Sequence, residues 1–462
     1  GSGAYGLGHA TTVIGAYAKG LGHQSQVLGF GSAASEQSTA IGSDTFAMGY
    51  SSIAIGNDDI YNEGKGLEDK LPEETINKIY KDLWEKEYGF RNNKSKVFRT
   101  KEDFYGAYFF NKKDNEDYRK YSPTFSRGHS SVAIGSRTVA YGEYSTALGT
   151  LNFALANKST AIGLRSFVDF NATGGTAIGE ESRVFAENSV AVGNKTEATN
   201  AGSMAYGYLS KAVGEGSVAI GHTVGSNAKL KDSSKTNFES NLNAIHNDNK
   251  IQEILNGEDS KISNLIKSAS KKDDKDVIEY EEESETVLTT TKDIHKTKKQ
   301  NNNAITIGHK SISNGFNSTV IGSSTAVFGS NSIGIGSLVH VTEEAKNSLA
   351  FGTGSYISKS NSIGLGTATR VKSKNSMALG VGSSIEENAD KSIAFGTGAK
   401  VMKDTTSGMA LGNGAVANLA NSVALGVNSK TDYDKENFNL CCFGSSIFFY
   451  ECTKTIPPNR KN

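Results

Sequence analysis

The hydrophobic positions of this chain follow a short pattern that recurs many times. A small polar residue precedes an apolar residue, an alanine, a second apolar residue and a glycine, as in Ser131-Val132-Ala133-Ile134-Gly135. Most copies lie 14 residues apart and the others 16, and half-steps of seven appear at Gly8, Gly15 and Gly22. The glycines that end these copies include residues 135, 149, 163, 179, 193, 207 and 221, and then 308, 322, 336, 352, 366, 380, 396, 412 and 426. A fixed period of this kind is typical of a solenoid.

Each copy predicts a short strand followed by a tight turn. Because side chains alternate along a strand, Val132 and Ile134 face one side and Ala133 the other. The glycine permits the positive φ of a tight turn. Two seven-residue halves then make a coil of two strands, and successive coils pair in parallel. We expect the Val/Ile face to be buried between two sheets and the alanine face to be open to another chain. Such a thin core makes a single copy marginal and predicts self-association.

Composition removes several classes of protein. The chain has 51 glycines but only 4 prolines, which excludes collagen. Its formal net charge is zero, with 49 basic and 49 acidic residues, so nucleic acid is not an expected partner. All cysteines lie at 441, 442 and 452, so disulfides do not hold the main body together. With no run of 18 apolar residues, we expect no direct membrane insertion.

The motif resembles the head repeat of YadA-like trimeric autotransporter adhesins, whose pattern is Asn-Ser-Val-Ala-Ile-Gly-x-x-Ser. Two close matches are Asn188-Ser189-Val190-Ala191-Val192-Gly193 and Asn421-Ser422-Val423-Ala424-Leu425-Gly426-Val427-Asn428-Ser429. The resemblance covers residues 1–56, 128–222 and 304–430, which we interpret as three parts of one head. It implies an all-β, left-handed parallel β-roll and a homotrimer on the outer membrane of a Gram-negative bacterium.

The resemblance also implies function and partners. Members of this family bind host matrix proteins or host cell receptors, so the expected partners are a host extracellular-matrix protein or an immunoglobulin-like adhesion receptor. Repeat residues of this kind are linked in the family to collagen binding. By that correspondence Asn188, Ser189, Asn421 and Ser422 are candidate matrix-binding residues. The alternative is that these four residues only form turns.

Residues 57–127 interrupt the repeats with an aromatic-rich insert. Pro72, Glu73 and Glu74 fit the start of a helix, and the stretch from Phe104 to Phe110 predicts a strand or hairpin. Because aromatic residues are enriched at binding hot spots, one interpretation is a receptor-recognition module. The other is that its aromatics form the insert's own core or wedge between subunits. The candidate receptor-binding residues are Trp84, Tyr88, Phe104, Tyr105, Tyr108, Phe109 and Phe110.

Two further segments depart from the repeat. Residues 223–303 are rich in Lys, Asp, Asn and Glu and predict a small helical protrusion followed by a flexible or hairpin-like loop. Residues 431–462 form an atypical tail that contains all the cysteines. The coiled-coil stalk and four-stranded anchor of the family are not recognisable after residue 430. The expectation is therefore a truncated, frameshifted or atypical end.

No catalytic or metal-binding motif stands out, so we predict no catalytic residues, no metal and no cofactor. His9 and His23 follow glycines one coil apart, and His222 and His309 also follow glycines; we expect turn residues rather than ion ligands. The prediction is a non-enzymatic adhesin head. One alternative is a spacer or fibre shaft, which would keep its binding after deletion of residues 57–127. A second is an enzyme on a parallel β-helix, such as a polysaccharide lyase, which would cleave a glycan.

Overall fold

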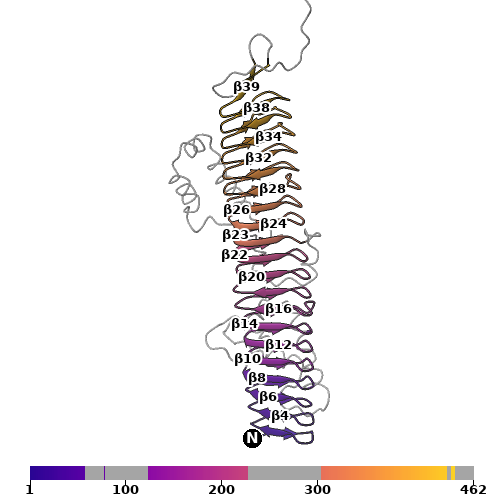
Figure 1. Cartoon of the computed structure of the whole chain (residues 1–462). Coiled ribbons are helices and arrows are strands. Elements are labelled where there is room, and N and C mark those ends of the chain that lie inside the picture. Colours follow the sequence, from indigo (N-terminus) through magenta and orange to yellow (C-terminus); the bar gives the residue numbers. More distant parts are fainter. Residues whose placement is uncertain (58–77, 79–122, 227–302, 434–438, 443–462) are drawn as a thin grey trace, which may run out of the picture. The chain divides into compact units, whose positions relative to one another are not determined.

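The computed structural model describes residues 1–57, 78, 123–226, 303–433 and 439–442. They fall into two units, divided between His222 and Thr223. Each unit is a stack of parallel strands, with about 20 turns of roughly 14 residues in the two together (Figure 1). The predicted parallel β-solenoid is therefore confirmed. Apart from Lys78, the segments in which helices were expected, 58–122 and 227–302, lie outside the described residues.

In unit 1, two ladders of parallel strands alternate along the chain. The first ladder contains the repeat motif, in β2 (Thr12–Ile14), β4 (Gln26–Leu28), β6 (Thr39–Gly42), β8 (Ile53–Asn57), β10 (Val132–Ser136), β12 (Thr146–Thr150), β14 (Thr160–Leu164), β16 (Thr176–Ile178), β18 (Val190–Val192), β20 (Met204–Tyr208) and β22 (Val218–Ser226). The second ladder contains β1 (Tyr5–Gly6), β3 (Lys19–Gly20), β5 (Ala33–Ala34), β7 (Thr45–Ala47), β9 (Thr124–Ser126), β11 (Val139–Ala140), β13 (Phe153–Ala154), β15 (Phe167–Val168), β17 (Arg183–Val184), β19 (Glu197–Ala198) and β21 (Lys211–Ala212).

Unit 2 repeats the arrangement. Its first ladder contains β23 (Ile305–Ser313), β24 (Thr319–Ser323), β26 (Ile333–Ser337), β28 (Leu349–Phe351), β30 (Ile363–Leu365), β32 (Met377–Leu379), β34 (Ile393–Phe395), β36 (Met409–Leu411) and β38 (Val423–Leu425). Its second ladder contains β25 (Ala326–Val327), β27 (His340–Val341), β29 (Tyr356–Ile357), β31 (Arg370–Val371), β33 (Ser384–Ile385), β35 (Lys400–Val401), β37 (Val416–Ala417) and β39 (Lys430–Tyr433). The last strand, β40 (Asn439–Cys442), pairs antiparallel with β39.

The solenoid of unit 1 keeps its register on both sides of residues 58–122. Strand β8 pairs with β10 so that Ile53 lies beside Val132 and Gly56 beside Gly135. In the second ladder β7 pairs with β9, which places Phe46 beside Phe125. The coil therefore resumes at Thr124, and the two ends of this segment belong to the same coil.

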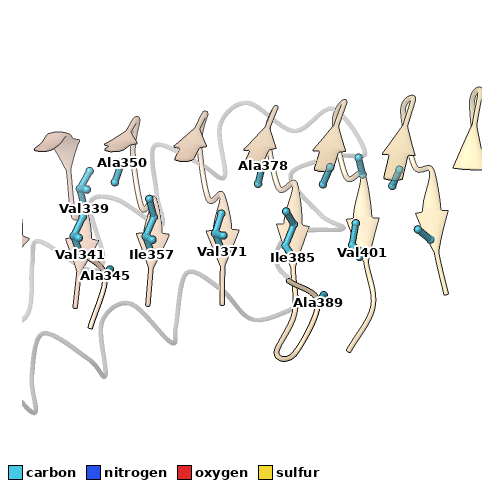
Figure 2. Packing of buried hydrophobic residues seen from close by; sticks show 14 of the residues in the cluster. Val339, Val341, Ala345, Ala350, Ile357, Val371, Ala378, Ile385, Ala389 and Val401 are labelled. Atoms are coloured by element: carbon cyan, nitrogen blue, oxygen red, sulfur yellow. The ribbon is translucent and has the colours of Figure 1, made fainter. Parts of the chain in front are cut away.

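The core of each coil is built from the alanines of the motif, which corrects the orientation expected from the sequence. Ala133, Ala147 and Ala161 are completely buried, whereas Ile134 is 38% exposed. Figure 2 shows the same arrangement in unit 2, where Ala350 and Ala378 point toward Ile357 and Ile385 of the second ladder. The prediction that the Val/Ile side is the interior was wrong. The inward positions of the first ladder hold alanine in most coils, glycine at 334 and 364, and valine at 27 and 320, so the core accepts small to medium side chains there.

The small polar residue that opens each motif also lies inside. Ser131, Ser145 and Ser159 have exposed fractions of at most 1%. Their hydroxyls donate hydrogen bonds of 2.6 Å to the carbonyls of Gly128, Gly142 and Ala156. A buried hydroxyl is costly unless it is paired, so the turn carbonyl makes serine acceptable at this position.

Candidate binding surface

In each unit, the outward residues of the first-ladder strands form a surface, here called the first-ladder face. The residue that closes the motif strand is apolar or aromatic in every coil, and the residue that opens it is apolar in most coils but polar in others, such as Gln26, Thr146 and Thr160. Ile134, Ile321, Phe351, Phe395 and Leu425 are 38%, 41%, 51%, 56% and 48% exposed. Isolated apolar side chains on a surface are ordinary, but a continuous apolar stripe marks an interaction site. The first-ladder face is therefore the strongest candidate for contact between chains.

A row of asparagines lies in the turn that precedes the first-ladder strands of unit 2. Asn317, Asn331, Asn347 and Asn361 have φ values of 50–55°, a region that asparagine tolerates better than most residues. Each side-chain Nδ2 donates to the Oδ1 of the next asparagine along the row, at 3.2–3.4 Å. The row continues at both ends, to Asn303 and Asn375. It presents a regular line of exposed amides, which the sequence analysis did not identify.

The structure separates the four candidate matrix-binding residues into exposed and inward-facing ones. Asn188 and Asn421 are exposed and occupy the positive-φ turn position, with φ of 53° and 55°. Ser189 is completely buried, and its hydroxyl donates to the carbonyl of Asn200 at 2.8 Å. The Ser422 hydroxyl is hydrogen-bonded to Thr431 Oγ1 at 3.1 Å. Of the four, the two asparagines are thus exposed, Ser422 is half-buried and Ser189 is buried.

The aromatic receptor-binding candidates from Trp84 to Phe110 lie outside the described residues. Lys78 is the one residue of 58–122 that the structure describes. Its ammonium group lies 3.9 Å from the centre of the Phe170 ring, and Tyr141 Oη donates to its carbonyl at 3.3 Å. The rings of Tyr141 and Phe170 meet edge to face at 5.1 Å, and the Arg127 guanidinium lies 4.4 Å from the centre of the Tyr141 ring. Such cation–π contacts attach Lys78 to the side of unit 1.

His9 and His23 occupy turns as expected, whereas His222 and His309 lie within strands β22 and β23, so the prediction of turn residues was wrong for these two. His9 and His23 stack with ring centroids 5.0 Å apart, and the backbone amide of His9 donates to His23 Nδ1 at 3.1 Å. His129 accepts the amide of Tyr50 in the same way, at 3.2 Å. Among the residues that the structure describes, no three His, Cys, Asp or Glu side chains gather in a group that could hold a metal ion. Within the same residues, no helix has the length and apolar character to cross a membrane.

These features define the class of the protein: a parallel β-solenoid with coils of about 14 residues and an alanine-lined core. The family model of the YadA head domain repeat matches residues 33–58, 126–152, 146–166, 171–196, 198–222, 358–383 and 406–429. The repeats in these segments are YadA head domain repeats, and their recurrence across the chain supports a YadA-like trimeric autotransporter adhesin head. A comparison with curated proteins found no match.

Proposed function

We propose that this chain is the head of a bacterial surface adhesin that acts as a homotrimer and attaches to a host matrix protein or an immunoglobulin-like host receptor. The single observation that carries the proposal is the first-ladder face, made by repeats of a family of surface-exposed adhesins. The fold and the repeats are typical of structural adhesins. Display on the outer membrane of a Gram-negative bacterium, and a non-catalytic role, are part of the proposal.

The trimer follows from the exposed apolar atoms of the first-ladder face. One or two apolar residues per coil, repeated along each unit, give an apolar stripe, and its burial stabilises by about 25 cal/mol per Å². Three copies facing a common axis cover all three stripes at once, with closed symmetry. Charge at this face would oppose assembly, because an ammonium group would have to be buried without a partner.

We expect the F351K/F395K variant to lose the trimer. The wild-type chain should have three times its 49.0 kDa mass at micromolar concentration, and the variant should have the mass of one chain. Light scattering coupled to size-exclusion chromatography measures both masses. The control is V416E, which adds a charge to the opposite face between Lys400 and Lys430 and should remain trimeric. A wild-type monomer at this concentration would disprove the assembly.

A binding experiment tests the adhesin function. The intact oligomer is incubated with immobilised collagen, fibronectin and a panel of immunoglobulin-like receptor ectodomains. We expect saturable binding to at least one of them and a reduction of tenfold or more for F351K/F395K, because separate chains lose multivalent attachment. A second arm removes residues 58–122, whose two ends lie in one coil, and asks whether this segment contains the receptor site. Absence of binding in every arm favours the spacer, and glycan cleavage would favour an enzyme.

A further inference from the structure

In unit 2, the residue that follows a second-ladder strand donates its backbone amide to the next coil. Glu386 donates to the carbonyl of Val401 at 3.0 Å, and Met402 donates to that of Ala417 at 2.9 Å. Each acceptor is the second residue of the next second-ladder strand. Because a buried backbone amide needs an acceptor, each coil depends on the following one at this point. The last coil of the stack therefore needs another acceptor.

The hydroxyl group of Thr431 is the acceptor in the last coil that the structure describes. Val416 pairs with Lys430, so Thr431 stands where the next carbonyl acceptor of the ladder is expected. Its Oγ1 accepts hydrogen bonds from the amides of Asn418 and Leu419, at 2.8 and 3.3 Å. Thr431 is buried. A side chain thus replaces the backbone carbonyl that a further coil would supply.

Strand β39 leaves the parallel stack at the same point. Only its first residue, Lys430, pairs in parallel with β37. All of β39 pairs antiparallel with β40, from Lys430 beside Cys442 to Tyr433 beside Asn439. The backbone of β40 also lies close to β38, the last strand of the first ladder. Strand β40 therefore lies next to the last strand of each ladder.

An uncovered strand at the end of a solenoid would be open to another chain. Its amides and carbonyls pair readily with a further strand, and repeat proteins need terminal caps for this reason. Without β40, strand β39 would be such an edge. Two identical strands that pair antiparallel are related by a two-fold axis, which closes the assembly. The partner that fits this edge is therefore β39 of a second copy of the chain.

We propose that Thr431 and β40 form a cap that closes the end of unit 2 and prevents β39 from pairing with β39 of a second copy. Thr431 satisfies the last turn amides, and β40 occupies the edge that the second copy would use. Both parts of the cap act within one chain, so the cap works in the same way in a single chain and in a trimer. This inference is independent of the proposed adhesin function.

Light scattering of the full-length chain under reducing conditions tests the edge. The L440P/C441P variant removes two adjacent amides of β40, one of which must point toward β39, and should release β39. We expect this variant to have about twice the wild-type mass at the same concentration. The matched variant L440A/C441A keeps both amides and should keep the wild-type mass.

A further proline identifies the strand that associates. Asp432 lies in the part of β39 that pairs with β40 and not with β37, so D432P blocks the edge without touching the parallel ladder. Adding D432P to L440P/C441P should restore the wild-type mass. An unchanged mass in L440P/C441P, or a doubled mass that D432P leaves in place, would overturn the proposal.

Hydrogen exchange tests the role of Thr431. The T431V variant keeps the shape of the side chain but removes the acceptor of the Asn418 and Leu419 amides. We expect these amides to exchange about tenfold faster than in the wild type, measured by mass spectrometry of the peptides that contain them. The control T325V removes a buried hydroxyl from an earlier coil of unit 2 and should leave this exchange unchanged. Equal exchange at Asn418 and Leu419 in the two variants would refute the cap.

Discussion

Replacing Gly135 by alanine is expected to disrupt the solenoid, with a loss of about 4 kcal/mol or more in unfolding free energy. Gly135 has φ of +133°, outside the region that residues with a Cβ adopt. An added Cβ would lie 1.7 Å from the carbonyl oxygen of Gly149 in the next coil. The backbone strain and the clash act together, and the clash falls on rigid backbone of a paired strand. Urea unfolding followed by circular dichroism measures the loss.

Gly202 provides the matched control for this substitution. Its φ is +66°, a left-handed conformation, and an added Cβ would have no neighbour closer than 3.9 Å. The G202A variant should therefore lose only about 1 kcal/mol, the ordinary cost of a left-handed residue with a side chain. If G135A and G202A lost the same unfolding free energy, the close approach of successive coils at the strand-end glycines would not be the cause of the loss.

The sequence allowed the period, the strands and the turns to be predicted because each depends on local chemistry. Glycine at 135 and asparagine at 188 occupy positive-φ positions, and the paired strands place copies of the motif beside each other in register. The period, the strands and the turns can all be inferred by comparing one repeat with the next. The family resemblance rested on the same residues and is confirmed by the family model.

The inside and outside of the strand could not be predicted in the same way. Alternation separates Val132 and Ile134 from Ala133 but does not say which side is the core. The general preference for burying larger apolar residues led to the wrong side. The folded coil decides the question, because its core is lined by the alanines and not by the larger residues beside them. In the proposed trimer the larger apolar residues would be buried after all, because they are expected to lie between chains.

The candidate sites were harder to predict for a related reason. Ser189 and Asn188 are adjacent in the sequence, yet one points into the core and the other to solvent. A change of residue type along the second ladder does leave a signal in the sequence, because Phe153 and Phe167 stand at the positions that Glu197 and Lys211 occupy in later coils. Finding that signal requires the register of the second ladder, whose strands have two residues and little pattern of their own.

His340 predicts a dependence of stability on pH. Its side chain is 6% exposed and lies edge-on between the rings of Phe328 and Tyr356, at 5.7 and 5.6 Å. Burial lowers the pKa of its imidazole from 6.5 to about 4, so the folded chain keeps it neutral. Above pH 6.5 both the folded and the unfolded chain hold it neutral. Between pH 6.5 and 4 the unfolded chain binds the proton first, and stability falls as the pH is lowered.

The expected loss over this range is about 3 kcal/mol per chain, from a shift of about 1.4 kcal/mol per pKa unit. Urea unfolding at pH 7.5, 6, 5 and 4 measures this loss. Because carboxylates also titrate over this range, the wild type is compared with a variant that lacks His340 and keeps those carboxylates. In H340F, which places at this position the residue that unit 1 has at Phe153, the loss should be smaller by this amount. The control H129F removes an exposed histidine, retains His340 and should show the full loss. A buried imidazole that resists protonation must make the solenoid easier to unfold in acid. Identical pH profiles for the wild type and H340F would therefore mean that His340 is not held neutral in the folded chain.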